Sequence, residues 1–305
     1  MTSHFIDLAD FDKSTLTNIL KDADAMKSGQ KLHHDRLAGK TVAMIFEKPS
    51  TRTRVSFEVG IRQLGGTPIN LRSEEMQLGR GESIADTAKV LSGYVDAIMI
   101  RTAGHNIITE LAENASVPVI NGLTDRSHPC QIMADMMTIA EVKAPDHDFS
   151  ALKVAWFGDG NNVAASFIEA AHVMGFRLDI AVPSSLAPDA ELMGMIDGEM
   201  IRLIEDPTEA AKDSDVLVTD TWVSMGDGGG SSNSGDLTAL LQRYQVNDKM
   251  MKLAHDDAIF LHCLPVYRDK EASANVVDGP QSVIWQEAEN RLHAQKAIMA
   301  FCLGL

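Results

Sequence analysis

Short apolar runs typical of buried β-strands alternate along this chain with segments whose apolar residues recur at helical spacing. In the first half the runs lie near residues 41–46, 67–71, 96–101 and 117–121. In the second half they lie near residues 153–158, 179–183, 200–205, 215–219 and 258–263. Strands that alternate with helices favour parallel sheets covered by helices. The pattern therefore predicts an α/β protein with doubly wound, parallel sheets.

A polar stretch, Pro145–Asp148, interrupts the alternation near the middle of the chain. With 305 residues, the chain has the length of two ordinary domains. We therefore expect two doubly wound domains, the first over residues 1–145 and the second over residues 146–280. A long helix is expected to close the chain at about residues 281–303.

The composition limits the classes of protein to which the chain can belong. Its formal net charge of −16 argues against non-specific binding to nucleic acid or to an anionic membrane. Its cysteines, Cys130, Cys263 and Cys302, are odd in number and far apart, which predicts neither a disulfide framework nor a paired metal motif. The N-terminus lacks a signal-peptide pattern, and no apolar run reaches the ~18–20 residues of a membrane span. We expect a soluble, cytoplasmic protein.

The stretch Glu47–Glu58 combines a strand end, a turn and a helix start within a few residues. Ser50 and Thr51 are residue types that cap helices, and Arg52 and Arg54 follow at once. The start of a helix carries unpaired N–H groups and the positive end of the helix dipole, and both attract anions. A capped surface helix with solvated arginines is the simpler alternative. Because strand, hydroxyls, arginines and helix coincide, we predict a site for an oxyanion such as phosphate.

Further polar residues follow the carboxyl ends of the expected strands, where ligands bind in parallel α/β sheets. They are Arg101, His128–Gln131, Asn161, Asn162, Asp220–Met225 and His262–Arg268. Each alone has an ordinary alternative: Arg101 as a salt-bridging residue, His128 as a loop histidine, and Cys263 as a small core side chain. Their repeated placement at strand ends favours a ligand site.

The segment Gly158-Asp159-Gly160 follows an expected strand and matches the start of a dinucleotide-binding fingerprint. However, Val163 occupies the third glycine position, and Asp179 lies early in the next strand rather than at its end. An NAD-dependent dehydrogenase is therefore a weak alternative.

Five short motifs together resemble those of the carbamoyltransferase family. They are Ser50-Thr51-Arg52-Thr53-Arg54, His128-Pro129-Cys130-Gln131, Asp220-Thr221-Trp222-Val223-Ser224-Met225-Gly226, His262-Cys263-Leu264-Pro265 and Glu289-Asn290-Arg291-Leu292-His293. The first two are shared with aspartate-using members, whereas the third and fourth, with Tyr244-Gln245-Val246-Asn247, resemble the ornithine-using members. The resemblance covers essentially the whole chain in order. It implies two domains joined by helices, an active site in the cleft, and neither a metal nor a cofactor.

By this resemblance, residues 1–145, completed by the C-terminal helix in 281–305, form a domain that binds carbamoyl phosphate. Gln77 would reach the site from a neighbouring subunit, because the family is typically a homotrimer with active sites at subunit interfaces. The implied binding residues are Ser50, Thr51, Arg52, Thr53, Gln77, Arg101, His128, Pro129, Cys130, Gln131, Cys263, Leu264 and Arg291.

By the same resemblance, residues 146–280 form a domain that binds L-ornithine. The reaction would be attack of the neutral δ-amine of ornithine on carbamoyl phosphate, which gives citrulline and phosphate. The expected catalytic residues are Arg101 and His128, which would donate to the developing oxyanion, and Cys263, which would shape the surroundings of the amine. The implied ornithine-binding residues are Asn162, Asp220, Ser224 and Met225.

Two alternatives remain open beside this reading. The first is a carbamoyltransferase for another amine, such as putrescine or an acylated ornithine. Asp220 and Ser224-Met225 argue against it, because a diamine lacks the α-carboxylate and α-ammonium that these residues would recognise. The second is a non-catalytic binding protein with the same fold.

The Gly/Ser-rich run at 226–235 is either a flexible linker or a mobile lid, and its position favours a lid.

Overall fold

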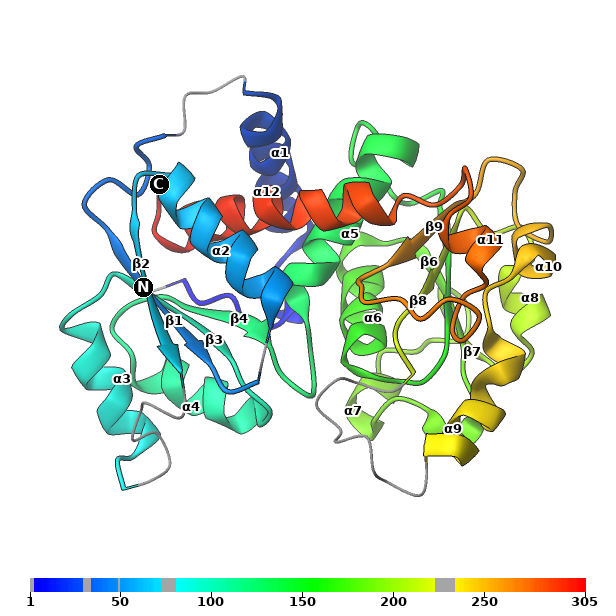
Figure 1. Ribbon diagram of the computed structural model, residues 1–305, viewed down its shortest axis with the longest axis horizontal. Coiled ribbons are helices and arrows are strands. Elements are labelled where there is room, and N and C mark those ends of the chain that lie inside the picture. Colours follow the sequence, from blue (N-terminus) through cyan, green and yellow to red (C-terminus); the bar gives the residue numbers. More distant parts are fainter. Residues whose placement is uncertain (1–2, 30–33, 49, 73–80, 223–233) are drawn as a thin grey trace. The chain divides into compact units, whose positions relative to one another are not determined.

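The computed structural model describes residues 3–29, 34–48, 50–72, 81–222 and 234–305, the last range without the side chains of residues 234–236. The chain forms two compact units (Figure 1), one made of Met1–Met137 with Asn290–Leu305 and the other of Thr138–Glu289. Each unit contains one parallel sheet. The predicted fold class, an α/β protein with two doubly wound parallel sheets, is confirmed.

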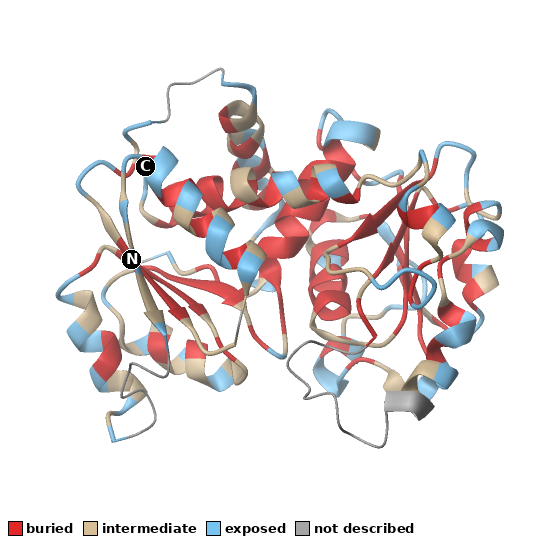
Figure 2. Ribbon diagram, in the orientation of Figure 1, coloured by how far each residue is buried: buried red, intermediate tan, exposed pale blue. Residues whose placement is uncertain are grey.

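The sheet of the first unit has the strand order β2-β1-β3-β4. Its strands are β1 (Thr41–Phe46), β2 (Thr67–Arg72), β3 (Ala97–Arg101) and β4 (Val119–Leu123), and its helices include α1 (Lys13–Ser28), α2 (Thr51–Gln63), α3 (Ile84–Ser92) and α4 (His105–Asn114). Alternate side chains of β1, Ala43 and Ile45, pack in one cluster with Ala88 of α3 and Ile108 of α4. Figure 2 shows β1, β3 and β4 as largely buried, which explains why these strands read as continuous apolar runs.

The sheet of the second unit has the strand order β7-β6-β5-β8-β9. Its strands are β5 (Lys153–Phe157), β6 (Arg177–Ala181), β7 (Ile201–Ile204), β8 (Val216–Thr219) and β9 (Ile259–His262). Its helices include α6 (Asn162–Met174), α7 (Ala190–Met193), α8 (Pro207–Ala211), α9 (Ser234–Leu241), α10 (Asp248–Met251) and α11 (Ala274–Val277). Phe157, Leu217 and Phe260, from three neighbouring strands, pack in one cluster with Tyr244 and Met250. This cluster is the core on one face of the sheet.

Two long helices have residues in both compact units. They are α5 (Pro129–Lys143) and α12 (Ile284–Cys302). The boundary between the units falls between Met137 and Thr138 in α5 and between Glu289 and Asn290 in α12. The division of the chain therefore lies within α5, whereas the sequence pattern breaks at the polar turn that follows this helix. The helix continues across this point and every residue from 129 to 140 is buried, so the sequence alone does not mark the division.

Two strands are displaced by two residues from their expected positions. We expected strands at 117–121 and 179–183, and the structure places β4 at Val119–Leu123 and β6 at Arg177–Ala181. Proline explains both differences, because it has no N–H for the strand ladder. Pro118 precedes β4, and Pro183 follows the end of β6.

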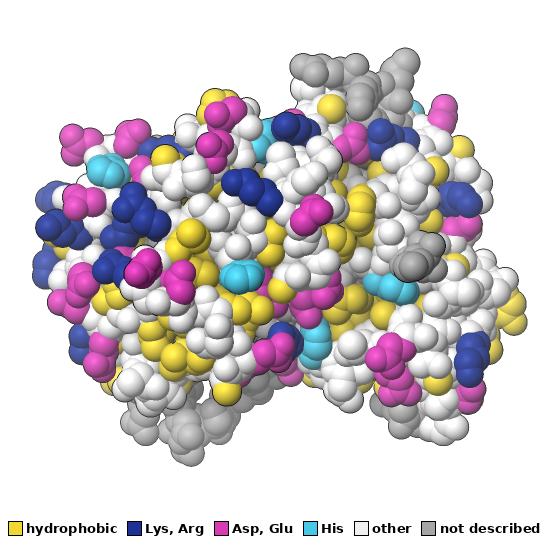
Figure 3. All heavy atoms as spheres, turned by 180° about the vertical axis from the view of Figure 1, so that it is seen from behind, with side chains coloured by type: hydrophobic (Ala, Val, Ile, Leu, Met, Phe, Trp, Pro, Cys, Tyr) yellow, Lys and Arg dark blue, Asp and Glu magenta, His cyan; other side chains and the backbone are white. Residues whose placement is uncertain are grey.

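No helix in the described part of the chain is both long enough and apolar enough to cross a membrane. On the face that Figure 3 shows, the acidic and basic side chains of the described residues are interspersed rather than gathered by sign.

Candidate active site

The turn from β1 into α2 places the start of a helix at the carboxyl edge of the first sheet. Ser50 is the N-cap residue, with extended backbone angles of φ −154° and ψ 112°. Within the described residues, its hydroxyl makes no capping hydrogen bond to the first turn of α2. Thr51 is exposed and Arg52 is half-buried. Hydroxyls, a guanidinium and helix N–H groups therefore lie together, as an oxyanion site requires.

Two arginines from distant segments meet at the hydroxyl of Thr53, in the first turn of α2. Arg101, at the end of β3, donates from Nη1 to Thr53 Oγ1 at 3.4 Å, and Arg291 of α12 donates from Nη2 at 2.7 Å. Thr53 is 1% exposed and Arg291 is 4% exposed. Two positive charges thus converge on one neutral hydroxyl in a largely water-free place, where their attraction for an anion is strong.

His128 follows β4 at the same edge of the sheet and is buried. Burial, followed by the charges of Arg291 and Arg101, lowers the pKa of His128 well below its usual value. The imidazole is therefore neutral near pH 7. A neutral imidazole donates one hydrogen bond and adds no third positive charge beside the two arginines.

The two residues after Pro129 are held by the protein itself. The Cys130 thiol donates to the carbonyl of Asn121 at 3.2 Å, and burial raises its pKa to about 12, so it stays protonated. The Gln131 amide donates to the Asp135 carboxylate at 2.7 Å, one turn further along α5. The side chain of Cys130 thus lies in the core, and the bond to Asp135 orients the carboxamide of Gln131.

At the carboxyl edge of the second sheet, Asp220 joins residues that follow three neighbouring strands. Asn161, after β5, donates from Nδ2 to Asp220 Oδ2 at 3.2 Å, while its own Oδ1 caps the start of α6. Cys263, after β9, lies with Sγ 3.0 Å from Asp220 Oδ1, and the Thr221 N–H donates to the same oxygen at 2.6 Å. The predicted residues Asp220 and Cys263 are therefore in direct contact.

His262 fixes the segment that carries Cys263. Its Nδ1 accepts the N–H of Leu264 at 2.9 Å, so the proton of the neutral ring is on Nε2, which faces Glu271 Oε1 at 3.4 Å. Leu264 is held in the left-handed region, at φ 60°. The main-chain N–H of His262 donates to Glu287 at 2.8 Å. These contacts orient the residues on both sides of Cys263.

Asp220, His262 and Cys263 are the one described trio with the spacing of metal ligands, since one ligand atom of each lies within 4.8 Å of the others. The lone pair of His262 Nδ1 already accepts the N–H of Leu264, and when Nε2 carries the proton neither nitrogen has a lone pair to offer a metal. This arrangement is better suited to hydrogen bonding than to holding an ion.

Asp159, which is not among the predicted site residues, interacts with Asp220 of this cluster. Burial, together with the negative charge of Asp220, raises the pKa of Asp159 to about 7. Asn161 was selected only as a strand-end residue, and Asn162, predicted to bind ornithine, opens α6 beside it. The signal for the capping role of Asn161 is its place as an Asn immediately before a helix, where N-caps occur.

Several predicted positions lie outside the described residues. They are Gln77, Ser224 and Met225, together with residues 226–233 of the Gly/Ser-rich run.

The dinucleotide alternative conflicts with two contacts. A Cβ on Gly160 would lie 2.5 Å from the main-chain nitrogen of Pro188, so this glycine allows two chain segments to approach each other. The acidic residue of the next strand, Asp179, makes a bidentate ion pair with Arg202 and a second pair with Lys153 at 2.8 Å. It is therefore committed to structure rather than directed at a ribose.

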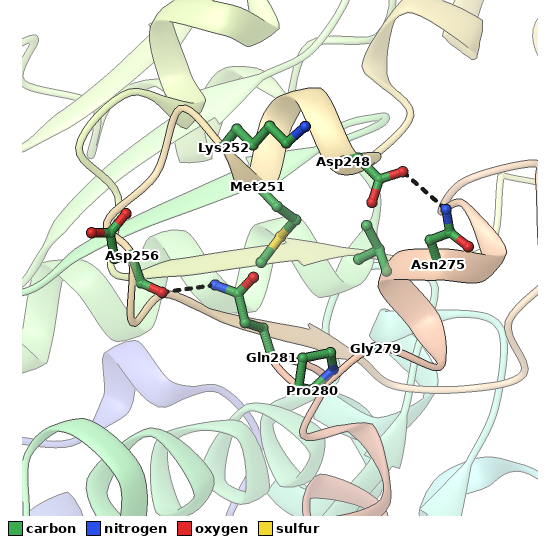
Figure 4. A pocket seen from close by; sticks show the side chains of 9 residues that line it. Asp248, Met251, Lys252, Asp256, Asn275, Gly279, Pro280 and Gln281 are labelled. Atoms are coloured by element: carbon green, nitrogen blue, oxygen red, sulfur yellow. Dashed lines mark hydrogen bonds between the residues drawn. The ribbon is translucent and has the colours of Figure 1, made fainter.

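A surface cavity of about 230 Å³ lies elsewhere in the second unit, beside α10 and α11 (Figure 4). Asn275 donates across it to Asp248, and Gln281 donates to the main chain of Asp256. The lining residues are Asp248, Met251, Lys252, Asp256, Asn275, Val276, Gly279, Pro280 and Gln281. None of these is a predicted site residue, so this cavity is separate from the candidate site.

Family models match both halves of the chain. Residues 3–141 match the carbamoyl-P binding domain of aspartate/ornithine carbamoyltransferases, and residues 150–302 match the Asp/Orn binding domain of the same family. The chain belongs to the aspartate/ornithine carbamoyltransferase family.

Within this carbamoyltransferase family, the chain is similar over its full length to proteins named ornithine carbamoyltransferase. One, from Rhodopseudomonas palustris, is 56% identical, over 100% of this chain and 97% of the relative. Another, from Nitrobacter winogradskyi, is 56% identical, over 99% of this chain and 97% of the relative. A solved ornithine carbamoyltransferase from Pyrococcus furiosus is 44% identical with a TM-score of 0.92, and covers 99% of this chain and 97% of its own.

Proposed function

We propose that this protein transfers the carbamoyl group of carbamoyl phosphate to the δ-amine of L-ornithine, giving L-citrulline and phosphate. Membership of the carbamoyltransferase family and similarity to proteins named ornithine carbamoyltransferase support this activity. The contact that carries it in the structure is the convergence of Arg101 and Arg291 on Thr53, beside a neutral His128.

The first unit supplies the site for carbamoyl phosphate in this proposal. The N–H groups at the start of α2 and the nearby guanidinium groups bind the phosphate, which leaves as an anion. The residues assigned to this ligand are Ser50, Thr51, Arg52, Thr53, Arg101, His128, Pro129, Cys130, Gln131 and Arg291, with Cys263, Leu264 and Gln77 as further members. For Cys130, whose thiol is buried, the main chain is the part that can contact the ligand.

Arg101 and His128 serve the chemical step. The δ-nitrogen attacks the carbonyl carbon, the bond from that carbon to the phosphate oxygen breaks, and a proton passes from the nitrogen to the departing phosphate. Negative charge grows on the carbonyl oxygen before the phosphate leaves. A guanidinium and a neutral imidazole N–H both stabilise that charge, and removing one such donor typically costs about 10²–10³-fold in rate.

Asp220 and its neighbours supply the ornithine site. Asp220 binds the α-ammonium group, and Asn162, Ser224 and Met225 hold the amino-acid end. The attacking amine must be neutral, although a free alkyl ammonium has a pKa of about 10.4. Cys263, in contact with Asp220, shapes the surroundings of this amine and forms no covalent bond with the substrate. None of these roles requires a metal or a redox cofactor.

The domain roles and the assembly belong to the same proposal. Residues 1–145 with the helix in 281–305 bind carbamoyl phosphate, and residues 146–280 bind ornithine. The division of the chain into two compact units and the two family models support this assignment. A homotrimer, with Gln77 supplied by a neighbouring subunit, is the assembly expected from the family resemblance.

One assay tests the activity and its acceptor. The protein is supplied with carbamoyl phosphate and, in parallel, ornithine, aspartate or putrescine, and the carbamoylated product and phosphate are measured. Formation of citrulline with ornithine alone is the expected result. Turnover with putrescine alone would reassign the acceptor, and absence of turnover with every amine would favour a non-catalytic binding protein.

A further inference from the structure

The chain near its N-terminus lies along the outer edge of β4, beside the segment that leads to His128. The Phe5 N–H donates to the carbonyl of Val119 at 2.8 Å, and the Asn121 N–H donates to the carbonyl of Phe5 at 2.8 Å. These bonds form an isolated parallel bridge between Phe5 and Ile120. Because Asp7 comes two residues after Phe5, this pairing brings its carboxylate to the loop that follows β4.

Asp7 closes a ring of hydrogen bonds with three residues near that loop. Ser127 Oγ donates to Asp7 Oδ1 at 2.5 Å, and His105 Nε2 lies 3.0 Å from Asp7 Oδ2. His105 Nδ1 lies 3.0 Å from Thr124 Oγ1, and that hydroxyl accepts the N–H of Ser127 at 3.1 Å. An Nε2 proton of His105 is directed at the Asp7 carboxylate, and the direction of the hydrogen bond between Nδ1 and the Thr124 hydroxyl depends on the protonation of the imidazole.

The hydrogen-bonded ring of four side chains is largely shielded from water, and Asp7 gives it a negative charge. The side chains of Asp7 and His105 are 13% and 21% exposed, and Ser127 is fully buried. Burial alone would raise the pKa of Asp7, but hydrogen bonds from His105 and Ser127, with the charges of His105 and Arg126, bring it below its usual value. Asp7 is therefore an anion that its neighbours stabilise.

Ser127 directly precedes His128 and is held at three points. Its side chain bonds to Asp7, its N–H donates to the Thr124 hydroxyl, and its carbonyl accepts the Thr124 N–H at 2.9 Å. Asn121 Nδ2 also donates to Ser127 Oγ at 3.0 Å. On the other side of His128, its own carbonyl accepts the N–H of Gln131 at 3.0 Å, in the first turn of α5. The backbone of His128 is thus fixed from both sides.

We infer that Asp7 is a positioning residue for His128, which it holds in place through Ser127 and the ring with His105 and Thr124. The inference rests on the proposed function for its effect on catalysis. Asp7 itself touches neither substrate nor reacting atoms. Its role is to keep the imidazole where it can donate to the carbamoyl oxygen, since a displacement of about 1 Å in a catalytic group can cost about 10²-fold in rate.

The test is a variant cycle on the full chain. Asp7→Asn and Ser127→Ala are each expected to lower kcat about tenfold, with less than about a threefold change in Kd for carbamoyl phosphate, because the phosphate is bound by α2 and the arginines. If Ser127 acts through His128, adding Ser127→Ala to His128→Ala causes no further loss of kcat. A full additional loss in the double variant would overturn the inference, and so would single variants with kcat within twofold of the wild type.

The matched control is Asp12→Ala, on the same N-terminal segment. Asp12 caps α1 by accepting the Thr15 N–H at 2.7 Å, so its loss lowers Tm without touching the ring. It should leave kcat unchanged. An equal loss of kcat in this control would show that weakening the N-terminal segment is sufficient, and would remove the special role of Asp7.

A second measurement does not depend on turnover. The imidazole nitrogen resonances of His128, assigned by comparison with His128→Ala, should shift in Ser127→Ala and Asp7→Asn but not in Asp12→Ala. Unchanged resonances in the first two variants contradict the inference. Because this result is independent of citrulline formation, it separates a failure of the positioning role from a failure of the proposed activity.

Discussion

Arg291 donates a hydrogen bond of 2.7 Å to the hydroxyl of Thr53, although the two residues are 238 positions apart in the sequence. Both side chains are buried. The contact joins α12, near the end of the chain, to the first turn of α2, where the oxyanion site was predicted. The C-terminal helix is thus part of that half-site and not only a cover for it.

Replacing Arg291 should impair carbamoyl phosphate binding and turnover. Arg291→Ala removes one of the two guanidinium groups at Thr53, and we expect kcat/KM for carbamoyl phosphate to fall about 10²–10³-fold, the usual cost of losing one such donor. Steady-state kinetics with carbamoyl phosphate varied at saturating ornithine measures this loss. Arg268→Ala is the control: although Arg268 belongs to the polar segment after β9, it pairs with Asp278 on the exposed surface and has no role in the proposed site. Similar losses in both variants would mean that general charge, rather than position, matters.

The sequence predicted residues that act where their own strand ends. Arg101 ends a strand of the first sheet, and Asp220 and Cys263 follow neighbouring strands of the second sheet. Each therefore lies at the carboxyl edge of its own parallel sheet, as the fold class alone predicts. Arg291 could not be found in this way, because it lies within a helix and its contact with Thr53 depends on how distant segments pack. Only the family resemblance brought it into the predicted site.

Sequence patterns also do not show which of two adjacent residues of the same type makes a given contact. Asn161 and Asn162 are adjacent and identical in type, yet Asn161 is the one whose side chain caps α6 and donates to Asp220. The backbone of the turn decides this assignment. The altered pKa of Asp159 likewise arises from burial and from Asp220, a residue 61 positions later in the printed sequence. Both features are long-range consequences of packing.

Cys263 should affect ornithine turnover without being essential. Its thiol contacts the Asp220 carboxylate, and a hydrogen bond to a charged group contributes about 1.5–3 kcal/mol. Cys263→Ala should therefore lower kcat/KM for ornithine by about 10–100-fold, and Cys263→Ser, which keeps a donor, by a smaller factor. Kinetics of both variants, with mass spectrometry of the wild type during turnover, makes the comparison. Detection of a carbamoyl-cysteine intermediate would contradict the non-covalent role.

Asp159 should make the stability of the protein depend on pH. Its pKa is about 7 in the folded protein and 3.8 as the ordinary value, so the folded state holds this proton more tightly than the unfolded state. Its contribution to stability is therefore lost as pH rises from about 4 to about 7 and stays absent above that. Each pKa unit corresponds to about 1.4 kcal/mol, which sets an upper limit of about 4 kcal/mol on the effect.

Asp159→Asn removes this titration and isolates it from others. Urea unfolding at pH 5 and at pH 8 measures the difference in stability between the variant and the wild type. Relative to the wild type, the variant should be more stable at pH 8 than at pH 5. Asp10→Asn provides a comparison, because Asp10 lies far along the chain from Asp159 and in the other unit. An equal difference between variant and wild type at both pH values would show that Asp159 does not titrate in this range.

Asp179 should be important for stability rather than for a cofactor. Its side chain is 3% exposed and pairs with Lys153 on β5 and with Arg202 on β7. Asp179→Ala therefore leaves the largely buried ammonium of Lys153 without a counter-charge, although its bond to a main-chain carbonyl remains. Loss of one member of a buried pair costs about 3–5 kcal/mol, and because Arg202 is 38% exposed we expect the lower end of that range. Urea unfolding measures the change.

The control is Asp278→Ala, which breaks the exposed pair with Arg268. It should have a much smaller effect, because water screens that pair and solvates the remaining charge. If the two variants lose equal stability, burial does not govern these ion pairs. If Asp179→Ala instead keeps its stability and abolishes binding of a dinucleotide, a dinucleotide-binding role for Asp179 would have to be reconsidered.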